Sequence, residues 1–425
     1  MTIILAIIFV LGYLAIAFEH SLKINKAASA LLTGVICWSI YALWGVEKEL
    51  VSEELAHHLS EIAGILFFLL GAMVIVELID AHDGFEIITD RIKTTSKSKL
   101  VWIVGMLAFF LSAVLDNLTT TIVMVSLLRK FIPAHKDRLM FAGLIVISAN
   151  AGGAWSPIGD VTTTMLWIGN QITTANIIIK TILPSLVCFF IPALFISMQM
   201  KGRLEPMPEK KEKLFSTLNE RRAVFIIGVA CLLFVPVFKT ITHLPPYMGI
   251  VFGLGTMWVL TEMVHSGKDE REKGLLSVNH ALRKIDTPSI LFFLGILLAV
   301  SALQSTGILT SVSAYLDKSV GNISIITIII GFLSAIVDNV PLVAAAQGMY
   351  SLERYPTDHF FWEFLAYCSG TGGSILIIGS AAGVAAMGME RIPFGWYLKK
   401  IAWLATIGYL AGAAVFLLQD YFLHL

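Results

Sequence analysis

The chain has 425 residues, of which 57% are hydrophobic and only 14% are charged, and its mean hydropathy is +0.81. Because a soluble domain carries about a quarter charged residues, this composition argues against a water-soluble fold. Lysine plus arginine and aspartate plus glutamate are equal at 30 each, a balance that predicts no nucleic-acid partner. We expect an all-α polytopic membrane protein in contact with lipid, without a separate soluble domain.

The opening residues are apolar and carry neither a basic segment nor a small-residue cleavage pattern, so they predict a first span rather than a signal peptide. The cysteines lie singly inside apolar segments, without a CxxC motif or a nearby histidine. This placement predicts packing roles rather than disulfides or a metal site. The four residues are Cys37, Cys188, Cys231 and Cys368.

Hydropathy predicts ten full spans, in chain order. They cover residues 2–19, 27–46, 62–81, 139–168, 174–200, 222–240, 246–265, 288–305, 359–388 and 396–418. Two further apolar regions, 99–128 and 322–349, are each interrupted near the middle by an Asp-Asn pair. A helix broken at a carboxylate inside a membrane predicts a re-entrant hairpin whose tip is buried in protein or faces water.

Two of the predicted spans, 139–168 and 359–388, are themselves interrupted by glycine-rich runs. Such runs predict broken helices whose free backbone groups lie at mid-depth, where an ion can use them. The residues concerned are Asn150, Ala151, Gly152 and Gly153 in the first span, and Gly370, Thr371, Gly372 and Gly373 in the second.

The two halves of the sequence repeat these features in the same order. Residues 110–117 match residues 332–339, and residues 65–69 match residues 290–294. Because the matches form an ordered series, they predict an internal duplication. The predicted parts are a first repeat over 1–201 with hairpin 99–128, a polar cytoplasmic linker over 202–220, and a second repeat over 221–425 with hairpin 322–349.

Lysine and arginine gather on one side of this topology, with 25 on that side and 5 on the other. The bias places the richer side in the cytoplasm and both termini outside it. Each half contains five crossings, an odd number, so the halves are predicted to be inverted relative to each other. One hairpin then enters from the cytoplasm and the other from outside, and their tips meet near the midplane.

The Asp-Asn pairs carry the predicted chemistry. Asp116 and Asp338 each interrupt an apolar segment, and intramembrane carboxylates are costly unless they serve an ion pathway. A structural alternative is that each Asp only caps the second helix of its own hairpin. Hard cations such as Na⁺ take oxygen ligands, which the tips supply in clusters. The clusters are Ser112, Asn117, Thr119 and Thr120 at the first tip, and Ser334 and Asn339 at the second.

Asp160 follows the first glycine-rich break, where the matching residue of the second half is Ser380. This asymmetry suggests a third ionisable group that carries a proton or binds sodium. The alternative is an Asp that only stabilises the N-terminus of a half-helix.

The tips Ser-Ala-Val-Leu-Asp-Asn-Leu-Thr-Thr at 112–120 and Ser-Ala-Ile-Val-Asp-Asn-Val-Pro at 334–341, with the two Gly-Gly breaks, resemble the NhaD-type sodium/proton antiporters of the ion transporter superfamily. The resemblance implies a homodimer with a scaffold domain and an elevator-like transport domain that carries the hairpins and broken helices. It also implies sodium ligands at Ser112, Asp116, Asn117, Ser334, Asp338 and Asn339.

We therefore expect a secondary antiporter that exchanges Na⁺ or Li⁺ for H⁺ across a bacterial inner membrane, without a cofactor. A sodium-coupled anion symporter or arsenite permease of the same superfamily is the alternative in transport. It would need Arg or Lys near the tips, and the sequence places none beside them. An intramembrane enzyme is a different class, for which neither an HExxH motif nor a nucleophile with a histidine partner is present.

Overall fold

The computed structural model describes residues 1–44, 48–89, 92, 94–204 and 216–423. Within these ranges the secondary structure is helical, apart from one isolated bridge between Ser96 and Arg203. The predicted linker 202–220 lies largely in 205–215, outside the described residues. The all-helical expectation is confirmed for the described part of the chain.

Eight helices, one of them in two joined segments, are long and apolar enough to cross a membrane. They are α3 (Lys26–Trp44), α4 (Lys48–Ala81), α6 (Lys97–Leu115), α10 (Thr174–Gln199), α11 (Leu218–Thr242), α12 (Pro246–Val264), α15 (Thr287–Ser305) and the segment Phe394–Phe422, which holds α21 (Phe394–Tyr397) and most of α22 (Trp403–Leu423). The remaining predicted spans are the 16-residue α1 (Thr2–Ala17) and the two interrupted ones. The chain is a multi-pass membrane protein.

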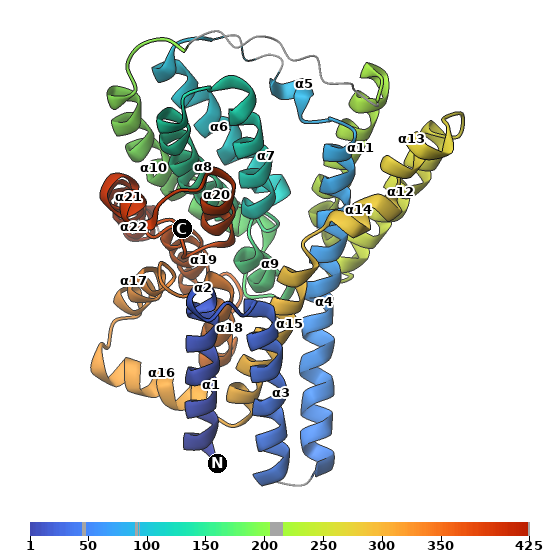
Figure 1. The fold of residues 1–425 in the computed structure, drawn as a ribbon. Helices are drawn as coiled ribbons and strands as arrows, with labels where there is room; N and C mark the ends of the chain where they lie inside the picture. Colours follow the sequence, from blue (N-terminus) through green and yellow to red (C-terminus); the bar gives the residue numbers. More distant parts are fainter. Residues whose placement is uncertain (45–47, 90–91, 93, 205–215, 424–425) are drawn as a thin grey trace.

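Six helices form what we call the long-helix group, namely α1, α3, α4, α11, α12 and α15. Figure 1 shows α1, α3 and α4 side by side in its lower half. Packing within this group pairs helices from the two halves of the chain. Helix α3 of the first half packs on α15 of the second, and α12 of the second half packs on α4 of the first. The α3–α15 contact is close: a Cβ on Gly295 would overlap the backbone of Ala30.

A second set of helices forms what we call the hairpin group, while the remaining helices, among them the short α2 (Glu19–Leu22) and α5 (Glu86–Thr89), belong to neither group. The hairpin group contains α6 and α10, with α7 (Asn117–Phe131), α8 (His135–Gly153), α9 (Val161–Ile168), α17 (Ile323–Leu333), α18 (Asn339–Met349), α19 (Phe360–Gly372), α20 (Ala381–Glu390), α21, the π-helical turn η1 (Leu398–Ala402) and α22. Here too the halves correspond, since α6 packs on α8 as α17 packs on α19, and α10 packs on α22.

Helices α6 and α7 form a hairpin that turns at Asp116. The start of α6 and the end of α7 lie at the same end of the hairpin. Ion pairs between these two helix ends and the neighbouring segments show this. Lys97 pairs with Asp137 at 2.6 Å, and Arg129 and Arg138 both bind Glu390, at 2.7 and 2.9 Å. The second hairpin, α17–α18, occupies the opposite end of the hairpin group in Figure 1.

Both predicted breaks are present, and each begins at or directly after its glycine pair. Helix α8 ends at Gly153 and α19 at Gly372, and the non-helical segments are 154–160 and 373–380. The glycines also allow close packing, since a Cβ on Gly152 would overlap Phe109 of α6 and one on Gly372 would overlap Gly331 of α17. Glycine here lets each hairpin lie directly on its broken helix.

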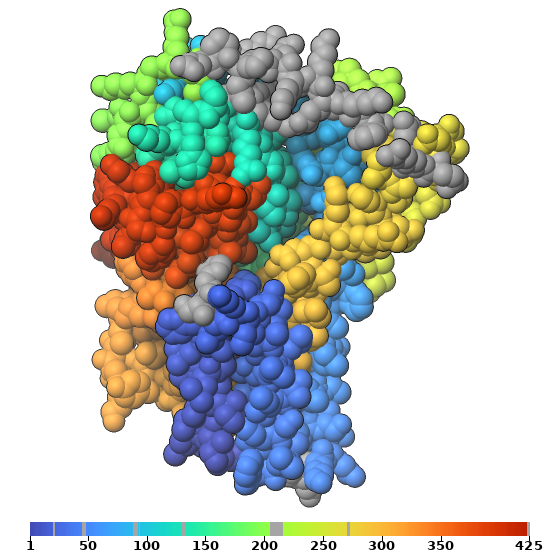
Figure 2. Space-filling view, in the orientation of Figure 1, coloured from blue at the N-terminus to red at the C-terminus, as the bar shows by residue number. Residues whose placement is uncertain are grey.

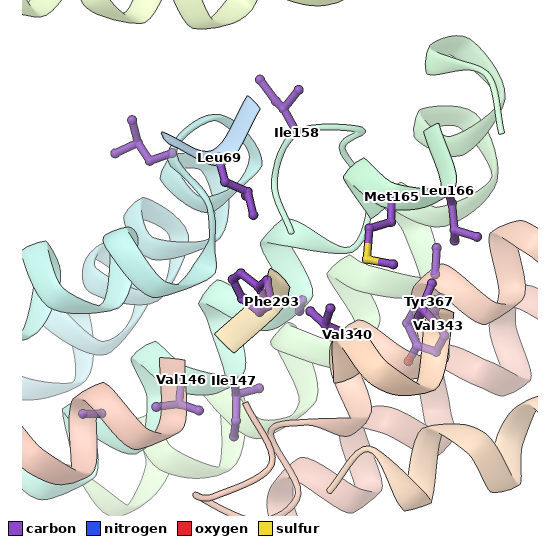
Figure 3. Packing of buried hydrophobic residues seen from close by; sticks show 14 of the residues in the cluster. Leu69, Val146, Ile147, Ile158, Met165, Leu166, Phe293, Val340, Val343 and Tyr367 are labelled. Carbon is purple, nitrogen blue, oxygen red and sulfur yellow. The ribbon is translucent and has the colours of Figure 1, made fainter. Parts of the chain in front are cut away.

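A core of apolar side chains joins the two groups. Figure 3 shows Leu69 of α4 and Phe293 of α15, which belong to the long-helix group, among side chains such as Val340 and Val343 of α18. Val343 is fully buried and Val340 nearly so. The second hairpin therefore packs against both groups.

Several helices were not predicted. Helix α16 (Ile308–Ser319) meets α17 at a bend of 119°, and α13 (Glu270–Leu275) and α14 (Val278–Lys284) lie between α12 and α15. Their mixed polar composition hides them from a hydropathy scan. Where α4 and α12 end, His82 and His265 are buried against each other, with 2.7 Å between their Nε2 atoms.

Candidate functional site

The first hairpin tip is built around the backbone and carboxylate of Asp116. Its φ of 76° lies in a region that few non-glycine residues adopt, so the chain turns sharply there. The carboxylate caps α7, because the Thr119 backbone N–H donates to Oδ1 at 2.7 Å and the Thr119 hydroxyl donates to Oδ2 at 2.9 Å. The predicted cap is confirmed, and Thr119 lies in the predicted cluster.

The second hairpin tip has ordinary backbone geometry, with a φ of −49° at Asp338. This carboxylate also caps its helix, accepting from the Val340 backbone N–H at 3.3 Å. Its other oxygen lies 3.6 Å from the ammonium of Lys26, the first residue of α3. The expectation that no Lys or Arg lies near the tips is therefore wrong, because residues separated by about 300 positions meet here.

The amides that follow the two tip carboxylates converge on Asp160. The Asn117 side-chain N–H₂ donates to Asp160 Oδ2 at 2.6 Å, and Asn339 approaches both carboxylate oxygens at 3.4 Å. Asp160 is 1% exposed and also caps α9, accepting from the backbone N–H and the hydroxyl of Thr162 at 2.9 Å each. The helix-cap reading of Asp160 is confirmed, and the same carboxylate is where the two hairpins meet, while its role as a proton carrier or sodium ligand stays a prediction.

The side chain of Asn150 links the two halves of the chain. Its oxygen accepts from Asn117 at 3.0 Å, while its N–H₂ donates to Ser374 and Ser380 at 2.9 Å each. The glycine-rich run predicted only a backbone role for Asn150, and no sequence pattern singled out Ser374. Ser380 matches Asp160 in the duplication and caps α20 as Asp160 caps α9.

The predicted serine ligands bond to backbone in the same way at both tips. Ser112 donates to the carbonyl of Ala149 at 2.6 Å, and Ser334 donates to that of Ser369 at 2.7 Å. Their hydroxyl oxygens retain lone pairs that an ion could use. Thr120 is fully buried, and its hydroxyl has no hydrogen-bond partner within the described residues.

The other predicted backbone positions are buried in α8 and α19. Ala151 and Gly370 lie within regular helix, and a Cβ on Gly370 would meet Ala154. The Thr371 carbonyl accepts from the Ser374 N–H at 3.0 Å, so it belongs to the turn that ends α19. A role in ion binding for the backbone groups at Ala151–Gly152 and Thr371–Gly372 therefore stays a prediction.

The three carboxylates interact without sharing one point in space. Asp160 lies within electrostatic reach of both tip carboxylates. In the part of the chain that the structure describes, no three acidic, histidine or cysteine side chains converge on one metal position. Asp116 and Asp160 instead accept hydrogen bonds from neutral donors, whereas Asp338 pairs with the ammonium of Lys26.

Comparison with known proteins identifies the family of the chain. Residues 3–372 match the family described as citrate transporter. Sodium/proton antiporter 1 of Arabidopsis thaliana is 49% identical over 97% of this chain and 72% of its own length, and sodium/proton antiporter 2 of the same plant is 47% identical over 97% and 98%. The Na⁺/H⁺ antiporter NhaD of Alkalimonas amylolytica is 30% identical over 96% of this chain and 89% of its own length. The chain thus belongs to the citrate transporter family and, within it, to the NhaD-type sodium/proton antiporters.

Proposed function

We propose that this protein is a secondary antiporter that exchanges Na⁺ or Li⁺ for H⁺ and uses the proton gradient to extrude the metal ion. The observation that carries the proposal is the convergence of Asn117 and Asn339, one from each hairpin tip, on the buried Asp160. The names of the NhaD relatives support the same exchange.

Exchange follows from competition at buried carboxylates. A carboxylate held away from water needs a proton, a cation or hydrogen-bond donors to offset its charge. In the structure the amides of Asn117 and Asn339 act as donors to Asp160. A side-chain amide also has an oxygen, so a half-turn of each amide would present oxygens to a bound Na⁺. A proton and a cation then occupy the cluster in turn.

We propose that Asp116, Asp160 and Asp338 are the exchanging groups. Neutral oxygens for the cation would come from Ser112, Asn117, Thr119, Thr120, Ser334 and Asn339. Burial supports this assignment, because Ser112, Thr120 and Ser334 are fully buried and both tip asparagines are 4% exposed. Asn150 would hold the two broken helices in register around the cluster.

We infer that residues 1–201 and 221–425 are inverted repeats. The matched packing of α3 on α15 and of α12 on α4 is what a two-fold relation between the halves would produce. In this arrangement the long-helix group would be a scaffold and the hairpin group a transport domain that moves as one body. The Asn150 contacts to both halves support motion as a unit.

We further propose a homodimer in the bacterial inner membrane, with both termini outside the cytoplasm. The orientation rests on the bias of basic residues, and the dimer rests on family resemblance. Single-cysteine labelling at the N-terminus and in the basic loops, with a membrane-impermeant reagent on intact cells, tests the orientation. Labelling of the basic loops in intact cells would reverse it.

The deciding experiment is reconstitution into proteoliposomes with an imposed pH gradient. Added Na⁺ or Li⁺ should dissipate the gradient, most strongly at alkaline pH, whereas K⁺ and choline serve as cation controls. Uptake of labelled citrate by the same vesicles tests the anion alternative, which the three carboxylates disfavour electrostatically. Well-incorporated protein that takes up citrate but leaves the pH gradient unchanged would overturn the proposal.

A further inference from the structure

The ammonium of Lys26 lies beside one of the exchanging carboxylates. Its Nζ is 3.6 Å from Asp338, and the two side chains are 24% and 16% exposed. The same ammonium lies over the ring of Phe292, 4.5 Å from its centroid. A carboxylate and an aromatic face are both sites that attract a cation, and here a residue of the protein occupies them.

The position of Lys26 in its helix needs an explanation. As the first residue of α3, it places a positive charge at the helix end where the backbone dipole disfavours cations. The start of the helix is nonetheless fixed, because Glu19 accepts from the Lys26 backbone N–H at 3.1 Å and Asn25 accepts from the Ala27 N–H at 2.8 Å. A neutral or acidic residue would suit the helix better, so the lysine serves its carboxylate partner.

Water can reach this ion pair. Lys26 lines a cavity of about 240 Å³ together with Glu19, Asp286, Leu118 and Ala381. Leu118 and Ala381 directly follow the site residues Asn117 and Ser380 in sequence. The cavity wall includes Lys26 and not Asp338, so an ion that enters this cavity can contact the ammonium side of the ion pair.

The ion pair also joins the two helix groups. Lys26 belongs to α3, which packs on α1 and α15, whereas Asp338 belongs to the second hairpin. Figure 2 shows the N-terminal helices, in dark blue, lying next to the orange segment that contains this hairpin. Contact between the two groups thus includes one charge pair at a proposed exchange site.

We propose that Lys26 is a positioning residue that acts as a tethered rival of the transported cation. Its ammonium neutralises Asp338 when no metal ion is bound, and a sodium ion must displace it to reach that carboxylate. Displacement would also release the charge pair between α3 and the hairpin. This inference rests on the proposed exchange and adds a residue that sets the apparent sodium affinity.

The test compares two substitutions of Lys26 with one of an exposed neighbour. Lys26→Met keeps a long apolar stem over Phe292 but removes the charge, and Lys26→Arg keeps the charge. Lys23→Met removes the same charge three residues earlier, at an exposed position. Each protein is assayed for Na⁺-driven proton movement and for the Na⁺ concentration that half-maximally raises its denaturation temperature in detergent.

We expect Lys26→Met to lower the apparent KM for Na⁺ and the half-maximal concentration about fivefold each, because a partly exposed ion pair of ordinary strength no longer competes. Lys26→Arg and Lys23→Met should stay within about twofold of the wild type on the same scale. A higher or unchanged KM in Lys26→Met would overturn the role as a rival cation.

The readouts separate this inference from the proposed function. If the wild-type protein shows no Na⁺-driven proton movement, the proposed exchange fails whatever Lys26 does. If the wild type exchanges and binds Na⁺ but Lys26→Met binds it no more tightly, only the role of Lys26 fails. The double variant Lys26→Met, Asp338→Asn should lose the gain in Na⁺ affinity, because the carboxylate for which Lys26 and Na⁺ compete is then absent.

Discussion

The two hairpin tips share a sequence but differ in how each carboxylate is satisfied. Asp116 lies at a turn with positive φ and receives two hydrogen bonds from Thr119 of its own helix. Asp338 has ordinary geometry, receives one longer bond from Val340 and pairs with Lys26 from another helix group. The Asp116 carboxylate thus accepts hydrogen bonds from neutral donors of its own hairpin, whereas the Asp338 carboxylate pairs with a charged residue from a distant helix.

This difference shows that two tips with matching sequences can hold their carboxylates in unequal surroundings. The contacts that hold the tips in place are the same in both halves, as the serine-to-carbonyl bonds and glycine contacts show. What differs is the run of residues after each Asp-Asn pair, Leu-Thr-Thr in one half and Val-Pro in the other, and the partner that approaches from outside the hairpin. The backbone contacts of the two tips thus agree, while the charges around them do not.

The largest expected effect comes from removing each tip charge. Asp116→Asn and Asp338→Asn keep the size and the capping ability of the side chain, so a purely structural Asp would leave exchange intact. We expect each to reduce the rate of Na⁺-driven proton movement at least about 100-fold, because a buried ion loses its compensating charge.

The control for this pair is Asp358→Asn, at an Asp away from the cavity that Lys26 lines, which accepts from the backbone N–H and the hydroxyl of Thr173. Membrane expression and size-exclusion profiles should match the wild type in all three variants. Near wild-type exchange in both tip variants would show that Asp116 and Asp338 are only helix caps, and would leave Asp160 as the first residue to test.

The matching contacts of the two tips can be tested through their glycines. Gly152→Ala and Gly372→Ala would each push a Cβ into the backbone of the adjoining hairpin, at Phe109 and Gly331. We expect both to destabilise the protein by about 1–3 kcal/mol, seen as a lower denaturation temperature in detergent. Gly388→Ala, also in a helix but with open space at Cβ, is the control. A large loss at one position only would break the equivalence of the two hairpins.

A smaller effect should follow from the loss of one donor at the first tip. Thr119→Val removes the hydroxyl that bonds to Asp116 Oδ2 and leaves the backbone cap in place. We expect the apparent KM for Na⁺ to change about tenfold, as for a hydrogen bond to a charged group. Thr240→Val, at an exposed helix position, should change nothing. An unaltered KM in Thr119→Val would mean that the hydroxyl serves only the turn.

The smallest effect is expected from restoring symmetry between the broken helices. Ser380→Asp places a carboxylate where the duplication puts the counterpart of Asp160, next to Asn150. The added negative charge should make the cluster hold its protons to a higher pH, so the active range moves up by about one pH unit while exchange continues. The pH profile of Na⁺-driven exchange measures this shift, and Ser374→Ala controls for the loss of a hydroxyl next to Asn150. A complete loss of exchange would contradict the expected tolerance.

Much of this architecture could be predicted from local sequence signals. The Asp-Asn interruptions predicted both hairpin turns and caps, because a polar pair in an apolar run has few other uses. The meeting of Asn117 and Asn339 at Asp160 could be anticipated only in outline, from the duplication and the common depth of the breaks. NhaD-type membership, read from the tips, is confirmed by the relatives.

Other features carry no local signal. Lys26 lies far from Asp338 in the sequence and reads as an ordinary basic residue at the end of a span. The glycine pairs predicted the breaks that follow them, but not the close contacts of Gly152 with Phe109 and of Gly372 with Gly331. Only the packing of distant helices reveals these contacts.

The histidine pair at the ends of α4 and α12 has a consequence for acid tolerance. If His82 Nδ1 donates to the Leu78 carbonyl at 2.6 Å, then His82 Nε2 must accept from His265. The Nδ1 of His265 is then a bare nitrogen without a partner among the described residues. A further proton at this nitrogen would create a buried imidazolium whose new N–H has no acceptor among the described residues, so burial disfavours the charged form of the pair.

Burial lowers the pKa of His82 and lowers that of His265 to about 4, whereas an unfolded histidine titrates near about 6.5. Between these pH values the unfolded chain binds protons that the folded chain does not bind. The free energy of unfolding is therefore undiminished above about pH 6.5 and decreases as the pH falls toward about 4. Denaturation temperatures across this window should decline less steeply in a His82→Phe, His265→Phe variant than in the wild type. His57→Gln, at a side chain that is 73% exposed, should leave the decline as it is. The histidine pair at the junction of α4 and α12 would then set the lowest pH at which the folded protein is stable. The proposed exchange, in contrast, is expected to be strongest at alkaline pH.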